Sequence, residues 1–245
     1  MLVIPAIDLR HGQCVRLTQG RRNASKVYGS NPVELARKLE RAGAQMVHVV
    51  DLDGAFTDKN SPNRQVLREI VRSIDIPIQF GGGLRKIQDV RDVIQLGVTR
   101  VVIGTLAVEE PETLIKLVHL FGGKHVVVGI DAKDGLVMTR GWETQESIGA
   151  LALARKVAEM GIERIVYTDV QRDGTLSGLN IDQTCFIAGG CGLKVTASGG
   201  VSSLEDLKRL RVLKESGVDS VIIGKALYEG LFTIQEALAV ASGPV

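Results

Sequence analysis

The chain has 245 residues, of which 44% are hydrophobic and 24% are charged, and its formal net charge is +2. This composition excludes a disordered or fibrous chain and suits a globular α/β protein of one large domain or two small ones. The small net charge gives no reason to expect a nucleic-acid partner.

Neither secretion nor membrane insertion is expected. A proline and an aspartate follow the first methionine too early for a signal peptide, and no apolar stretch approaches the roughly 18 residues of a membrane span. Cys14, Cys185 and Cys191 have no disulfide-framework or metal-ligand spacing. We therefore expect a cytoplasmic monomer that uses no metal and no cofactor.

Eight short apolar runs recur along the chain and predict β-strands. Most are continuous and rich in valine and isoleucine, which is typical of parallel strands that are buried on both faces. In chain order they span residues 2–8, 46–51, 76–80, 100–103, 125–131, 164–169, 193–197 and 220–223.

Segments with apolar residues at helical spacing separate these strands. Asn31 followed by Pro32 predicts a helix start, with a cap and then a proline at the first helical position. Ser203, followed by acidic residues, predicts a second capped start. Glycines stand where four helices are expected to end before the next strand: Gly43, Gly97, Gly161 and Gly217.

Eight strand–helix units in 245 residues give about 31 residues per unit, which is typical of a (β/α)8 TIM barrel. No linker or low-complexity stretch divides the chain, so we predict a single domain over residues 1–245. A doubly wound open sheet is the alternative, but it does not explain the internal repeat described next.

The chain repeats its own landmarks in one order. Each landmark of the first half returns 117 to 123 residues later, which predicts two half-barrel repeats of roughly residues 1–122 and 123–245. The pairs are Asp8 with Asp131, Asp51 with Asp169, Gly83 with Gly200, and Gly104 with Gly224.

Two of the repeated aspartates are candidates for catalysis. In a β/α barrel the carboxyl ends of the strands line the active-site mouth, and Asp8 and Asp131 both stand there. A predicted hairpin, not a helix, follows each of them, so neither caps a helix. The repeat places them on opposite walls, which suits a reaction with a base on one side and an acid on the other. We expect Asp51 and Asp169 to be mainly structural.

Glycine-rich turns follow four of the predicted strands. Such turns bring backbone N–H groups close to an anion at the positive end of a helix. Two mirrored sets predict a substrate with a phosphate at each end; the alternative is that the glycines only permit tight turns. The residues concerned are Gly82, Gly83, Gly104 and Thr105 in the first half, and Gly199, Gly200, Gly224 and Lys225 in the second.

Two polar loops are expected to frame the mouth. Residues 16–31 have the composition of a closing loop, and residues 171–178 form a second loop. Trp142, the only tryptophan, lies in a loop, where its indole either stacks on a flat heterocycle or packs against the loop. His48 lies inside a strand and is expected to form part of the wall and not to be a catalyst.

Nine segments between residue 1 and about residue 239 form a specific combination of motifs: 4–9, 15–17, 19–20, 48–52, 81–85, 141–142, 168–169, 172–175 and 198–200. Together they resemble the isomerases of histidine biosynthesis, the phosphoribosylformimino-aminoimidazole carboxamide ribotide (ProFAR) isomerases. The related cyclases typically have Cys-Leu-Asp-Val at the end of the first strand and a lysine soon after, whereas this chain has Ala6-Ile7-Asp8-Leu9 and no such lysine.

The resemblance implies a cofactor-independent Amadori rearrangement of a bisphosphorylated aminoaldose to its aminoketose. It implies that Asp8 accepts a proton and that Asp131 donates one, roles that the residue pattern alone leaves open. It also implies that Thr168 and Asp173 assist. The matching segments add three residues to the expected substrate-binding set: Arg16, Gly20 and Arg85.

Three other functions remain open at this point. One is a dual-substrate isomerase that also acts on phosphoribosylanthranilate in tryptophan synthesis. Another is a lyase of the cyclase type, supplied with ammonia by a glutaminase. The third is a non-catalytic barrel that senses a bisphosphorylated metabolite.

Overall fold

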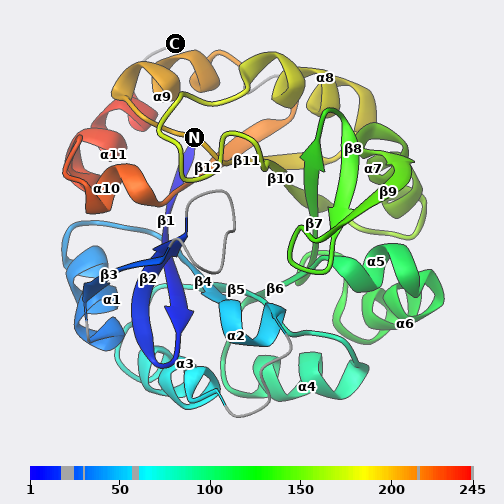
Figure 1. Cartoon of the computed structure of the whole chain (residues 1–245), viewed down its shortest axis with the longest axis horizontal. Helices are drawn as coiled ribbons and strands as arrows, with labels where there is room; N and C mark the ends of the chain where they lie inside the picture. The colour runs from blue at the N-terminus through cyan, green and yellow to red at the C-terminus, as the bar shows by residue number, and fades with distance from the viewer. Residues whose placement is uncertain (18–24, 30, 57–60, 214–215, 244–245) are drawn as a thin grey trace.

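The computed structural model describes residues 1–17, 25–29, 31–56, 61–213 and 216–243. Eight parallel strands form a closed barrel, and helices surround it (Figure 1). The strands pair in the order β1, β4, β5, β6, β7, β10, β11 and β12, and β12 pairs back with β1. The (β/α)8 barrel is therefore confirmed, and an open sheet is excluded because the ring closes.

Every predicted strand is present, and its boundaries shift by at most a few residues. β6 and β10 coincide with the predicted ranges, whereas β1 and β7 continue two residues further than expected. The barrel strands are β1 (Leu2–Arg10), β4 (Val47–Asp51), β5 (Ile78–Gly81), β6 (Arg100–Ile103), β7 (Val126–Lys133), β10 (Arg164–Asp169), β11 (Lys194–Ser198) and β12 (Val218–Ile223).

Two strands leave the barrel as hairpins, and this confirms the hairpins predicted after Asp8 and Asp131. Asp8 pairs antiparallel with Val15 of β2 (Gln13–Leu17), and β2 pairs with β3 (Ser25–Gly29). In the other half, β7 pairs with β8 (Leu136–Thr139), which pairs with β9 (Thr144–Gly149).

The expectation of one closing loop over residues 16–31 was wrong in part. Residues 25–29 form β3, because their backbone pairs with β2 and extends the hairpin sheet. Residues 18–24 lie outside the described residues. Residues 171–178 form a loop, as predicted.

The predicted helix starts are confirmed by their caps. The Asn31 side chain accepts a hydrogen bond from the Glu34 N–H, and Ser203 forms a capping box with Asp206. The helices are α1 (Pro32–Arg41), α2 (Leu52–Ala55), α3 (Asn63–Val71), α4 (Ile87–Gln95), α5 (Thr105–Glu109), α6 (Pro111–Phe121), α7 (Ala150–Glu159), α8 (Ile181–Cys191), α9 (Leu204–Arg211), α10 (Lys225–Tyr228) and α11 (Ile234–Ser242).

Three of the four glycines that were predicted to end helices stand just past the last residue of a helix. Gly43, Gly97 and Gly161 come two residues after α1, α4 and α7, and Gly217 precedes β12. Among the described residues, no helix is both long and apolar enough to span a membrane.

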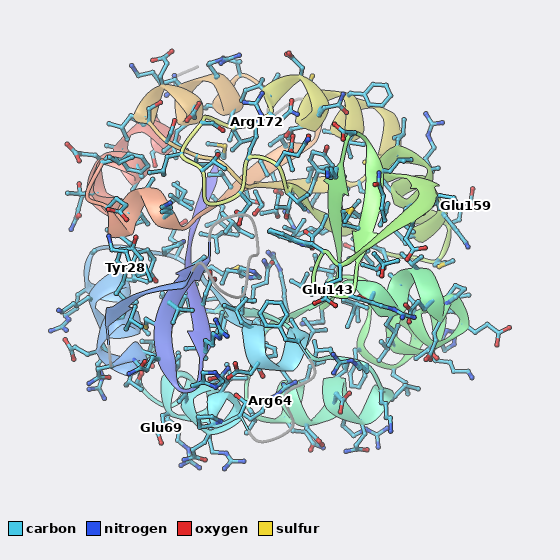
Figure 2. The ribbon with its side chains drawn as sticks, viewed as in Figure 1. Tyr28, Arg64, Glu69, Glu143, Glu159 and Arg172 are labelled. Carbon is cyan, nitrogen blue, oxygen red and sulfur yellow. The ribbon has the colours of Figure 1, made fainter. Side chains whose placement is uncertain are left out.

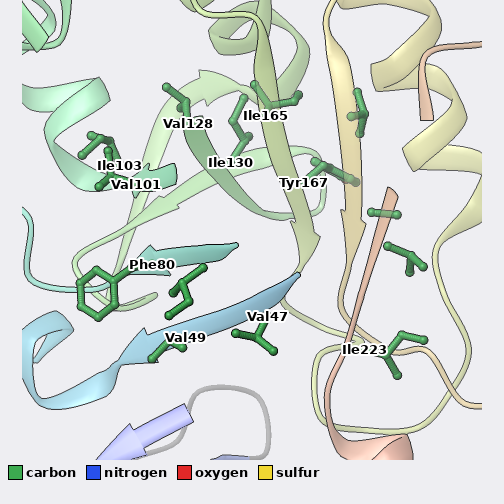
Figure 3. Close-up of a cluster of buried hydrophobic side chains, with 14 of the residues drawn as sticks. Val47, Val49, Phe80, Val101, Ile103, Val128, Ile130, Ile165, Tyr167 and Ile223 are labelled. Atoms are coloured by element: carbon green, nitrogen blue, oxygen red, sulfur yellow. The ribbon is translucent and has the colours of Figure 1, made fainter. Parts of the chain in front are cut away.

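The core has two layers because side chains alternate along each barrel strand. Ile165 and Tyr167 of β10 point outward, into the large cluster between barrel and helices, part of which Figure 3 shows. Val166, between them, belongs to a smaller cluster inside the barrel with Ile4 and Ile222. At the carboxyl ends of the strands, Val166 and Ile222 of this inner layer line a cavity.

A partly buried ion pair lies near the amino-terminal ends of the strands. The Arg164 side chain is 9% exposed and that of Asp219 is 32% exposed; the guanidinium donates to both carboxylate oxygens of Asp219 and also to the hydroxyls of Thr196 and Ser220. Burial alone would raise the pKa of Asp219, but the hydrogen bonds and charge of Arg164 outweigh it, so the pKa lies below its usual value.

We expect Arg164→Met to destabilise the protein by about 1–3 kcal/mol at pH 7, because it leaves the partly buried Asp219 carboxylate without its guanidinium partner. Urea unfolding followed by circular dichroism measures this change. The wild-type protein loses the same stabilisation as the pH falls from about 4 through the lowered pKa of Asp219. Equal stability of the two proteins at pH 7 would show that the ion pair contributes nothing.

Candidate active site

A cavity of about 610 Å³ opens at the carboxyl ends of the strands, and every barrel strand contributes to its lining. Its size suits a small-molecule substrate. Glu143 and Arg172 lie on segments that frame the mouth, whereas Glu69 and Glu159 lie on the outer rim of the molecule (Figure 2). This is the end of the barrel at which β/α-barrel enzymes carry their active sites.

Asp8 and Asp131 both line this cavity, from β1 and β7. Three barrel strands separate β1 from β7 in either direction around the ring, so the two carboxylates belong to opposite walls. The structure thus brings together the pair that the repeat predicted.

The Asp131 carboxyl group has two hydrogen-bond donors. The indole N–H of Trp142 donates to its Oδ2 at 2.7 Å, and the Thr168 hydroxyl also bonds to it. Burial raises the pKa of Asp131 above its usual value and outweighs these two hydrogen bonds, each of which lowers it. A raised pKa increases the protonated fraction of a carboxyl group at a given pH, which is a property of general acids.

The sequence did not indicate this role of Trp142. We expected stacking or packing, whereas the indole donates a hydrogen bond to a candidate catalytic group. The backbone explains why, because Arg140, Gly141 and Trp142 all have a positive φ, of 55°, 67° and 70°. Two non-glycine residues in this conformation mark a strained loop that turns the indole into the cavity.

The loop that carries Trp142 also hydrogen-bonds to Thr105, a predicted phosphate-binding residue. The Arg140 N–H donates to Thr105 Oγ1 at 2.9 Å, and the Arg140 guanidinium pairs with Glu109. Thr105 lines the cavity as predicted. Accepting this bond does not use the hydroxyl proton, so the Thr105 side chain can still donate to an anion.

The glycine turns of the two halves have matching shapes. Gly82 and Gly200 have positive φ, of 100° and 92°, and a Cβ on either would lie within 3 Å of backbone oxygen. Gly104 and Gly224 share an unusual conformation, with φ/ψ of −101°/−100° and −111°/−99°. All six predicted glycines that the structure describes line the cavity: Gly82, Gly83, Gly104, Gly199, Gly200 and Gly224.

The helices beside these turns differ in how their first N–H groups are used. In α4 and α9 an acidic side chain of the first turn, Asp89 or Asp206, accepts the N–H groups that precede the helix. In α5 and α10 no side chain caps the first turn. The first turns of α5 and α10, beside Gly104 and Gly224, therefore differ from those of α4 and α9 in having no acidic cap.

A basic residue lines the cavity in each half. Arg85 donates to the carbonyls of Gly54 and Ala55, and Lys225 donates to the carbonyl of Gly174 at 2.7 Å. Thr168 and Asp173 also line the cavity.

Two predicted site residues have no described side-chain position. The backbone of Arg16 belongs to β2, but its side chain is not among those described. Gly20 lies outside the described residues.

His48 and the repeated pair Asp51 and Asp169 have the structural roles that the sequence predicted. His48 is a wall residue whose ring Nδ1 lies 3.2 Å from the Gln79 amide. Asp51 caps α2 and accepts a hydrogen bond from Asn63, and Asp169 accepts one from Asn180. Within the described part of the chain, no cluster of three histidine, cysteine or acidic side chains is placed to hold a metal.

Sequence reasoning missed an apolar side of the cavity and its acidic rim. Phe56 and Met138 contribute the apolar side, and Glu109 and Glu143 contribute the rim. None has a local signal, because each reaches the mouth through the three-dimensional arrangement of its segment; Met138 lies on β8 and Glu109 on α5.

Known proteins of one family match this chain over nearly its whole length. A family model described as histidine biosynthesis protein matches residues 2–233. A relative from Desulforudis audaxviator is 50% identical over 239 residues, covering 98% of this chain and 90% of the relative. One from Moorella thermoacetica is 48% identical over 242 residues, covering 99% of both chains. One from Carboxydothermus hydrogenoformans is 49% identical over 243 residues, covering 99% of both.

All three relatives are named as phosphoribosyl-substituted imidazole-4-carboxamide isomerases. The match covers nearly the whole chain and includes both opposed aspartates and both sets of glycine turns. This chain belongs to the imidazole-4-carboxamide isomerase family of histidine biosynthesis.

Proposed function

We propose that the protein converts the bisphosphorylated aminoaldose ProFAR to its aminoketose by an Amadori rearrangement, without a cofactor. The observation that carries the proposal is one cavity with Asp8 and Asp131 on opposite walls and a glycine turn in each half. The substrate class comes from the names of the relatives, which contain two phosphoribosyl groups.

Asp131 is the proposed proton donor. It protonates the ring oxygen of the aminoaldose, and the ring then opens. A free aspartic acid, with a pKa of about 3.9, is only about one part in a thousand protonated at pH 7. The raised pKa of Asp131 increases that fraction, and Thr168 holds the carboxyl group in place through its hydrogen bond.

Asp8 is the proposed proton acceptor. From the opposite wall it removes the proton of the carbon next to the opened imine. The resulting enolamine then loses its enol proton and takes up a proton at the former imine carbon, which gives the aminoketose. Each proton transfer contributes about 10²–10⁴-fold to the rate. Asp173 assists from the loop over residues 171–178, which the bond between Lys225 and Gly174 holds beside the cavity.

The two phosphates are assigned to the two halves. One lies at the turns of Gly82, Gly83 and Gly104, with Arg85 near it. The other lies at the turns of Gly199, Gly200 and Gly224, with Lys225 near it. Arg16, Gly20 and Trp142 remain predicted substrate contacts.

The direct test is to mix the purified protein with the aminoaldose bisphosphate and to follow the ketose by its absorbance change. We expect Asp8→Asn and Asp131→Asn each to lower kcat by at least about 10²-fold, because each removes one proton-transfer group. Binding of inorganic phosphate should persist in both variants, since the glycine turns remain. Full activity in both variants would refute the assignment.

Phosphoribosylanthranilate is run as a parallel substrate. Turnover of both substrates would identify a dual-substrate isomerase. Ammonia-dependent turnover would instead identify a cyclase, and tight binding without turnover would identify a sensor.

The pH dependence follows from the state of Asp131. A proton donor must be protonated in the free enzyme, so kcat/KM falls as the pH rises through the raised pKa of Asp131. The Trp142 N–H stabilises the ionised carboxylate, and Trp142→Phe removes this bond. We therefore expect the alkaline limb of the pH profile to move to higher pH in that variant.

Thr168→Val is the variant matched to Trp142→Phe, because the Thr168 hydroxyl also lowers the pKa of Asp131. Its alkaline limb should shift in the same direction. A shift of either profile to lower pH would contradict the proposed role of Asp131.

A further inference from the structure

The hairpins that carry Asp8 and Asp131 share one type of turn. His11 and Gly12 connect β1 to β2 with φ of 48° and 78°, and Asp134 and Gly135 connect β7 to β8 with φ of 51° and 79°. Two successive left-handed residues are typical of a type I′ turn. The two central N–H groups of such a turn lie outside the strand ladder and need other partners.

In the first hairpin, both turn N–H groups have buried side-chain partners. The His11 N–H donates to Asp53 Oδ2 at 2.7 Å, and the Gly12 N–H donates to Asn63 Oδ1 at 2.8 Å. Asp53 is 2% exposed and Asn63 is 0% exposed. The turn is therefore bonded to the protein interior at both of its central residues.

Asn63 also holds the strand end that carries Asp8. Its Nδ2 donates to the carbonyl of Leu9 at 3.0 Å, and also to Asp51 at 2.7 Å and to Asp53 at 3.0 Å. Leu9 directly follows Asp8. One buried carboxamide thus bonds to the backbone on both sides of the bend between Asp8 and β2.

The second hairpin lacks these bonds. Asn180, in the position equivalent to Asn63, donates to Asp169 at 2.6 Å, but its Oδ1 accepts from the Gln183 N–H instead of from the turn. Within the described part of the chain, neither Asp134 nor Gly135 donates a backbone hydrogen bond. A cavity of about 170 Å³ lies between this turn and Asn180, with room for several waters.

We propose that Asn63 is a positioning residue for Asp8, and that the Asp131 hairpin has no equivalent. The inference rests on the proposed function, in which Asp8 removes a proton from carbon. Asn63 does not line the catalytic cavity, so it acts through the backbone that holds Asp8. Proton removal from carbon needs closely defined geometry, and a misplacement of about 1 Å costs on the order of 10²-fold in rate.

Amide hydrogen exchange of the wild-type protein tests the asymmetry directly. The His11 and Gly12 amides should exchange slowly, because their acceptors are buried, and the Asp134 and Gly135 amides should exchange fast. Equal exchange at the two turns would overturn the proposal. This measurement needs no variant, so it decides the question even if a substitution of Asn63 prevents folding.

Asn63→Ala and Asn180→Ala form a matched pair, because each removes a carboxamide bonded to a strand-end aspartate. Only Asn63→Ala removes bonds to a catalytic hairpin. We expect it to lower kcat by about 10–100-fold with KM changed less than about 3-fold, while Asn180→Ala keeps kcat near the wild-type value. In Asn63→Ala the Gly12 amide should exchange as fast as the Gly135 amide.

The outcomes distinguish a failure of the positioning role of Asn63 from a failure of the proposed function. Equal losses of kcat in the two variants, or no loss in Asn63→Ala, would overturn the positioning role. If Asp8→Asn is inactive while Asn63→Ala is fully active, only the positioning role fails. If Asp8→Asn is fully active, the proposed function fails.

Discussion

The ring of parallel strands closes because β10 hydrogen-bonds to β7, and the geometry of the site depends on that closure. Closure fixes the number of strands between β1 and β7 on both sides and so places Asp8 and Asp131 on opposite walls. It also brings the turns after all the parallel strands to one end of the barrel. Neither half contains a complete site, because each supplies one carboxylate and one set of glycine turns.

The two carboxylates differ because their surroundings differ. Burial opposes the ionised form of Asp131, while the indole of Trp142 and the hydroxyl of Thr168 favour it. Asp8 stands on a hairpin whose turn is bonded to Asp53 and Asn63. The two carboxylates therefore have different surroundings although both stand at strand ends, and this difference supports the two roles proposed for them.

Much of the fold followed from local patterns, whereas the fine structure of the site did not. The apolar runs predicted the strands, and Asn31 and Ser203 marked helix starts, because these signals act within a few residues. The bond from Trp142 to Asp131 was missed, because it depends on a left-handed backbone at non-glycine residues. The bond from Gly12 to Asn63 joins residues 51 positions apart, and no local pattern indicates it.

The most direct measurement is a crystal structure of the protein with the bisphosphorylated aminoketose bound. The account predicts one phosphate at the turns of Gly83 and Gly104 and the other at those of Gly200 and Gly224, with the Asp8 and Asp131 carboxyl groups on opposite sides of the reacting carbons. Both phosphates in one half of the barrel, or both carboxyl groups on the same side of the ligand, would contradict it.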